Sequence, residues 1–249
     1  MKKIFSFLLV IISICSLLLY GCSSNEQNSR QSEKLSIVTS IFPYYDFARN
    51  IVGDKADVKL LLSPGNEPHH YEPSPSDIVA IEECDIFIYN GGESDEWVEN
   101  VLDSLENKNI TVLKMTDYVS LLNEKNPDHT DGDEADEHIW TSVRNAEQLV
   151  KKISAVVTEK DNKNKSEYEN NTNQYLLSLD ELDKEFTDVV NNKKRDTVVF
   201  GDRFPFLYFM TDYGINYECA FPGCSSETEP SLDVVTRLVD YVRDNNIPV

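Results

Sequence analysis

Short apolar runs and amphipathic patterns alternate along the chain from residue 35 onward. The short runs are rich in β-branched and aromatic side chains, as is typical of strands, and the patterns between them repeat apolar residues at helical spacing. Each connection is long enough for a helix to cross back over a sheet, so the alternation predicts an α/β lobe with a mostly parallel sheet. The predicted strands are 35–41, 58–62, 85–89 and 110–113, and the predicted helices are 44–52, 75–83, 96–105 and 146–160.

A narrow apolar stripe continues over a much longer segment, residues 164–190. A helix of that length spans about 40 Å. A coiled-coil dimer is one interpretation, but the stripe covers fewer than four heptads, so we favour a single backbone helix, 163–192, that links an N-terminal lobe to a second lobe. The stripe consists of Tyr168, Tyr175, Leu179, Leu182, Phe186 and Val189.

Residues 193–249 predict the start of a second α/β lobe. The expected elements are a strand at 197–200, a helix at 204–213, a strand near Tyr217, a helix at 232–242 and the beginning of a strand at 247–249. So few strands make a poor folding unit. We therefore expect the second lobe to be truncated in this sequence, although an unusually small second lobe is the alternative.

The N-terminus has the pattern of an export signal. Two lysines precede the apolar stretch 4–20, and Gly21 and Cys22 follow it. Residues 19–22 resemble the bacterial lipobox, which implies removal of residues 1–21 as a lipoprotein signal peptide and lipidation of Cys22. Residues 22–34 are then a polar tether, and the N-terminal lobe is 35–162. An uncleaved membrane anchor is the alternative, and either interpretation places the rest of the chain outside the cytoplasm.

Composition excludes one class of partner. The chain carries 44 acidic and 23 basic side chains, a net charge of -21, and no block of basic residues. A nucleic-acid backbone is therefore not an expected partner. A hydrophobic content of 40% and an aromatic content of 10% nevertheless predict a folded protein.

The cysteines suggest one possible crosslink. Cys219 and Cys224 are close enough in sequence to close a small disulfide loop in an oxidising compartment. A thiolate zinc site is the alternative for this pair, but no second pair of cysteines supports it. Cys84 follows an amphipathic segment, so we interpret it as a buried small side chain.

Histidines in two loops are the candidate chemistry. His69 and His70 follow the second predicted strand, and His138 closes an acidic segment, 123–137. Ligand sites of α/β folds lie in such loops, and neutral imidazole is a good ligand for zinc. The acidic segment could collect cations weakly before transfer, or it could simply be a solvated loop.

Four sequence motifs are similar to those of the zinc and manganese solute-binding lipoproteins of ABC importers, the cluster A-I family. They are PHHYEPSPSD at 68–77, YNGGESDEW at 89–97, DEHIW at 136–140 and ETEPS at 227–231. The resemblance implies two α/β lobes joined by one long rigid helix, with a single metal ion in the cleft between them. It also implies a monomer that is not an enzyme and that delivers zinc or manganese to a membrane permease.

The resemblance also implies metal ligands, position by position. The first motif places a ligand at His69 and leaves His70 variable, and the third places one at His138, with Glu137 where proline is usual. The family's third ligand position falls on Arg203, which cannot bind a cation, so we take the neighbouring Asp202 as the candidate. The fourth family ligand would lie beyond Val249.

Two other functions fit the same features. A surface adhesin could use the same fold to bind a protein. A zinc-dependent hydrolase would need a general base, for which Glu72 or Glu137 could be proposed, but no HExxH array supports it. For the transported ion we expect zinc first and manganese second, because replacing an imidazole by a carboxylate shifts the preference toward manganese.

Overall fold

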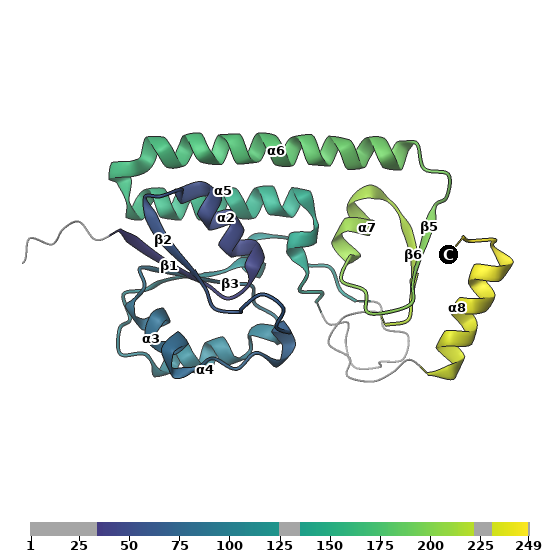
Figure 1. Cartoon of the computed structure of the whole chain (residues 1–249), viewed down its shortest axis with the longest axis horizontal. Coiled ribbons are helices and arrows are strands. Elements are labelled where there is room, and N and C mark those ends of the chain that lie inside the picture. Colours follow the sequence, from purple (N-terminus) through teal and green to yellow (C-terminus); the bar gives the residue numbers. More distant parts are fainter. Residues whose placement is uncertain (1–33, 125–134, 222–230, 249) are drawn as a thin grey trace, which may run out of the picture. The chain divides into compact units, whose positions relative to one another are not determined.

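The computed structural model describes residues 34–124, 135–221 and 231–248 (Figure 1). All the elements below belong to one compact unit, Leu35–Val249. Within the described residues, no helix combines the length and the apolar character that a membrane span requires. The domain boundaries expected from the sequence remain predictions.

A four-stranded parallel sheet organises the N-terminal half of this unit. Its strands are β1 (Leu35–Thr39), β2 (Ala56–Leu60), β3 (Ile86–Tyr89) and β4 (Thr111–Lys114), in the order β2-β1-β3-β4. All three pairings are parallel, so the carboxyl ends of the four strands lie along the same edge of the sheet. The α/β class predicted from the sequence is confirmed.

The two faces of the sheet are covered by different helices. Ile86 and Ile88 of β3 belong to a core that includes residues of α2 (Phe42–Val52) and α5 (Val143–Lys160). Phe87 and Tyr89, which point to the other face, belong to a second core with residues of α3 (Pro75–Glu83) and α4 (Trp97–Ser104). Figure 1 shows these two helix pairs on opposite sides of the sheet. Strand β3 is therefore buried on both faces, as its continuous apolar run indicates.

A capping box fixes the start of α3. The hydroxyl of Ser74 accepts a hydrogen bond from the backbone N–H of Asp77, and the carboxylate of Asp77 accepts one from the backbone N–H of Ser74. Tyr71 also donates to this carboxylate, at 3.0 Å. These bonds anchor one end of the loop that carries the 3₁₀ helix η2 (Pro68–His70).

Helix α6 (Lys165–Asn191) has 27 residues and confirms the long helix predicted from the apolar stripe. It lies beside α2 and α5, and near its end it contacts α7 (Leu207–Tyr213) (Figure 1). Tyr168 and Leu179 of the stripe are buried, whereas Val189 is exposed. The helix therefore packs on its own chain, as expected for a helix that joins two lobes rather than a coiled-coil dimer.

A second, two-stranded parallel sheet follows α6. It pairs β5 (Thr197–Phe200) with β6 (Asn216–Cys219), and α7 connects them. Gly214 ends α7 in the left-handed conformation, with φ of 60°. The last helix is α8 (Leu232–Asp244), and residues 247 and 248 lie in neither a helix nor a strand.

The start of α7 differs from the prediction of residue 204. Pro205 disfavours a helical conformation at Phe204, so the helix begins only at Leu207. Phe204 is instead fully buried in a small core with Leu207 and Met210. Periodicity therefore identified the apolar residues of this segment correctly but placed the helix start three residues too early.

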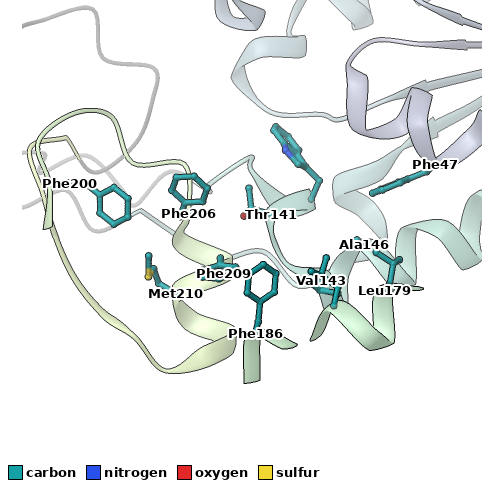
Figure 2. Close-up of a pocket in the computed structure, with 12 residues that line it drawn as sticks. Phe47, Thr141, Val143, Ala146, Leu179, Phe186, Phe200, Phe206, Phe209 and Met210 are labelled. Atoms are coloured by element: carbon teal, nitrogen blue, oxygen red, sulfur yellow. The ribbon is translucent and has the colours of Figure 1, made fainter. Parts of the chain in front are cut away.

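An apolar cavity of 590 Å³ separates part of α6 and α5 from the second sheet (Figure 2). Phe186 of α6 and Phe209 of α7 lie side by side at its wall, with ring centroids 4.9 Å apart. Packing between these helices and the segment that carries β5 and α7 is therefore aromatic but incomplete. The lining residues labelled in Figure 2 are Phe47, Thr141, Val143, Ala146, Leu179, Phe186, Phe200, Phe206, Phe209 and Met210.

Two leucines of α6 test which face of this helix stabilises the fold. Leu179 is 9% exposed and Leu177 is 69% exposed. Replacing Leu179 with alanine should lower the free energy of unfolding by about 2–4 kcal/mol, because it enlarges an existing cavity. Replacing Leu177 with alanine, the matched control, should change it by less than about 0.5 kcal/mol. Urea unfolding followed by tryptophan fluorescence measures both, and equal losses would contradict the assignment of the packed face.

Candidate functional site

The structure brings His69 and His138 together and leaves His70 apart. His69 lies in η2, in the loop after β2, and His138 directly precedes the 3₁₀ helix η5 (Ile139–Thr141). Their ring centroids are 6.5 Å apart, and their side chains are only 10% and 8% exposed, whereas His70 is exposed. Both loops follow strands of the parallel sheet, at the edge where α/β folds bind ligands.

Glu137 is the third member of this cluster. Potential ligand atoms of His69, Glu137 and His138 all lie within 4.8 Å of one another. Oε1 of Glu137 is 3.4 Å from Nδ1 of His69, and the side chain of Glu137 is 9% exposed. In the sequence, Glu137 was notable only as a replacement for proline and as a possible base. Its direct neighbour His138 was the signal that could have identified it.

Asp136 fixes the orientation of His138. Its Oδ1 accepts a hydrogen bond of 2.8 Å from the backbone N–H of His138 and lies 3.2 Å from Nδ1 of the ring. Such a carboxylate holds the ring in one tautomer and directs Nε2 to a metal ion. Trp140 packs against the same ring, with centroids 5.4 Å apart. The imidazole is therefore positioned before any ion arrives.

The loop that carries His138 is bound from two sides. On one side, the backbone N–H of Asp136 donates to the carbonyl of Leu122, at 2.8 Å. On the other, the hydroxyl of Tyr208 in α7 donates to the carbonyl of Asp136, at 2.7 Å. Helix α7, which follows α6 in sequence, thus helps to hold Asp136, two residues before His138.

The motif at 89–97 forms the support beneath Glu137. The side-chain amide of Asn90 donates to the carbonyl of Glu137 at 2.9 Å, and the hydroxyl of Tyr44 donates to the side-chain oxygen of Asn90. Oδ2 of Asp95 accepts bonds from the backbone N–H groups of Asn90 and Gly91, at 2.8 and 3.0 Å. This motif is therefore part of the site, although it supplies none of the clustered ligand atoms.

Burial and negative charge dominate the electrostatics of the site. Burial raises the pKa of Asp95 to about 6, an effect opposed by its backbone hydrogen bonds and increased by the charge of Glu137. Burial and the same two carboxylates, Asp95 and Glu137, also raise the pKa of Tyr44 well above its ordinary value. Each raised pKa means that the protonated, neutral form of the side chain is favoured over its negatively charged form.

Asp202 is not part of the His69, Glu137 and His138 cluster. Its side chain is exposed, and its Oδ1 accepts a hydrogen bond of 2.8 Å from the backbone N–H of Arg203. Arg203 itself extends toward the loop of His69, where Nη1 lies 3.9 Å from Oε2 of Glu67. The assignment of Asp202 as a ligand remains a prediction.

Other sequence predictions fall partly or wholly outside the described residues. These are the lipidation site Cys22, the partner cysteine Cys224, and most of the acidic segment and of the motif at 227–231. Cys219 is described as half-buried, and burial raises the pKa of its thiol to about 11. Pairing of Cys219 with Cys224 therefore remains a prediction. Cys84 is buried, as expected.

The raised pKa of Asp95 predicts a pH dependence of stability. Its folded pKa of about 6 exceeds the ordinary value of 3.8, so the folded state binds more protons between these pH values. The contribution of Asp95 to stability should therefore fall as pH rises from about 4 to 6, by up to about 3 kcal/mol. Asp95→Asn should remove this slope, and Asp103→Asn in the exposed part of α4 should not. Urea unfolding of chelator-treated protein across this range measures the effect, and an unchanged slope in Asp95→Asn would contradict it.

Comparisons with known proteins agree with this architecture. The family described as zinc-uptake complex component A, periplasmic (ZnuA) matches residues 37–249. Zinc-binding lipoprotein AdcA of Streptococcus pneumoniae is 34% identical over 255 residues, which cover 99% of this chain and 49% of that protein. High-affinity zinc uptake system protein ZnuA of Bacillus subtilis is 30% identical over 252 residues, covering 97% and 78%. The chain thus spans about half the length of AdcA.

A solved structure extends the similarity to three dimensions. The Zn(II)-bound ZnuA-like domain of Streptococcus pneumoniae AdcA superposes with a TM-score of 0.72 at 33% identity, covering 86% of this chain and 76% of that one. The similar proteins named here are described as zinc-binding or zinc-uptake proteins rather than as enzymes. The resemblance suggested by the four motifs is confirmed, and the chain belongs to the family described as zinc-uptake complex component A, periplasmic (ZnuA).

Proposed function

We propose that this protein captures a divalent transition metal outside the cytoplasm and delivers it to the membrane permease of an ABC importer. The observation that carries this proposal is the convergence of His69 and His138, two shielded imidazoles from separate loops at one edge of the sheet. Their distance in sequence means that an ion bound by both would hold two loops in one arrangement. A permease could recognise that arrangement.

Zinc is the cargo that this donor set fits best. Imidazole nitrogen is a preferred ligand of zinc, and a carboxylate completes common zinc sites. Manganese is the second choice, because a carboxylate is a harder ligand than an imidazole and suits manganese better. The names of the relatives, zinc-binding lipoprotein and zinc-uptake protein, support the same order.

The location follows from the same comparison and from the N-terminus. Relatives are named as a lipoprotein and as a periplasmic component, which supports an extracytoplasmic, membrane-associated protein. The finer proposal is a lipid anchor on Cys22, with residues 22–34 as the tether. The protein acts as a monomer, and its partner is the permease.

The two clustered histidines should be essential for metal binding. His69→Ala and His138→Ala should each weaken zinc binding by about 100-fold or more, since even loss of an outer-shell partner costs about 10- to 100-fold. His70→Ala is the matched control and should bind as the parent does, because His70 is exposed and lies outside the cluster. Titration of chelator-treated protein with zinc, in competition with an indicator, measures all three. Full affinity in His69→Ala would show that the site is elsewhere.

Asp202 can be tested beside its neighbour. If its carboxylate binds the ion, Asp202→Ala should weaken zinc binding by about tenfold or more, while Arg203→Ala should mainly change the local charge. The same competition titration distinguishes the two variants. Parental affinity in Asp202→Ala would remove Asp202 from the site without affecting the role of the histidines.

A further inference from the structure

Glu137 is a buried carboxylate that faces a histidine rather than a lysine or an arginine. In residues 34–124, 135–221 and 231–248, no lysine or arginine forms an ion pair with Glu137, Asp136 or Asp95. Asp136 and Glu137 face histidines, and Asp95 is satisfied by backbone N–H groups and Ser40. Buried charges of one sign are costly unless a counter-charge is present. A divalent cation would supply that counter-charge.

The distance between Glu137 and His69 matches the distance between two ligand atoms on one metal ion. Oε1 and Nδ1 are 3.4 Å apart, longer than the usual N–H···O hydrogen bond of about 2.7–3.2 Å. Two ligand atoms on a tetrahedral zinc ion, each about 2.0–2.2 Å from the metal, lie about 3.4 Å from each other. This pair of atoms can therefore coordinate one ion with little movement.

The side chain of Glu137 is held in this position by the loop after β3. Its Oε2 accepts a hydrogen bond of 3.2 Å from the backbone N–H of Ser94, so Oε1 remains directed toward His69. Gly92 makes room for the carboxylate: a Cβ at this position would lie 2.6 Å from Oε2. Gly92 also has φ of 108°, which favours glycine. The orientation of the Glu137 carboxylate is therefore set by residues outside the His69, Glu137 and His138 cluster.

We infer that Glu137 is a direct ligand of the transported ion, so that His69, Glu137 and His138 form a His₂Glu set contributed by the first lobe. This inference rests on the proposed function and adds a ligand at a position where the family motif has proline. It also supplies a donor in a chain that has Arg203 at the third ligand position. Three protein ligands leave a zinc ion one further position for water or for another side chain.

The competing explanation is that Glu137 is a positioning residue. In that case its carboxylate accepts a hydrogen bond from Nδ1–H of His69, and the ion binds only to imidazoles. Glutamine at position 137 could still accept that bond, whereas it is a much poorer metal ligand than a carboxylate. A Glu137→Gln variant therefore separates the two roles.

The test compares Glu137→Gln with Glu159→Gln, a matched change at an exposed glutamate near the end of α5. We expect Glu137→Gln to lose about tenfold or more in zinc affinity, with a larger loss for manganese, and Glu159→Gln to lose none. Thermal unfolding in the presence of a chelator should show that both variants are folded. A crystal structure of the zinc complex should place Oε1 about 2.0–2.2 Å from the ion.

The outcomes separate this inference from the proposed function. Parental affinity in Glu137→Gln, together with losses in His69→Ala and His138→Ala, would overturn the inference and leave the function standing. A zinc complex in which Oε1 stays on Nδ1 of His69 and away from the ion would also overturn it. If none of these three variants loses affinity, the proposed function itself fails.

Discussion

The side chain of Asn90 is the point on which the site depends. It receives the hydroxyl hydrogen of Tyr44 from α2 and donates to the carbonyls of Gly91 and Glu137. A single amide thus joins a helix on one face of the sheet, the loop after β3 and the loop that carries His138. Because all these groups are buried, each lost bond would leave a polar atom unsatisfied, at a cost of about 1–3 kcal/mol. The loop after β3 and the loop of His138 are therefore held together by this amide, whereas the loop of His69 lies outside these bonds.

Much of the fold could be predicted because it depends on local patterns. The strand β3 has a short continuous apolar run and the helix α6 a long apolar stripe, and the structure contains both close to the expected bounds. One difference has a local cause, since Pro205 delays the start of α7. Another does not: β2 begins at Ala56 rather than at residue 58, because its pairing with β1 continues to that residue. Pairing between strands is a long-range property that periodicity does not contain.

The site was predictable only in part. His69 and His138 could be identified from their motifs, and the structure places them together. The membership of Glu137 depends on how the loop after β3 directs its side chain, through Ser94 and the space at Gly92. Those residues are more than 40 positions away in the sequence, so no local pattern connects them. Asp202 neighbours a family ligand position in the sequence, but whether its side chain joins the cluster is a three-dimensional property.

The close approach of Gly92 to Glu137 leaves no room for a side chain at position 92. A Cβ there would lie 2.6 Å from Oε2 and 2.9 Å from Cβ of Glu137, and the φ of 108° itself favours glycine. The second clash involves an atom that every residue except glycine carries, so a substitution at position 137 would not relieve it. Glycine at position 92 is therefore compatible with either residue before the second histidine, the glutamate of this chain or the proline of the family motif.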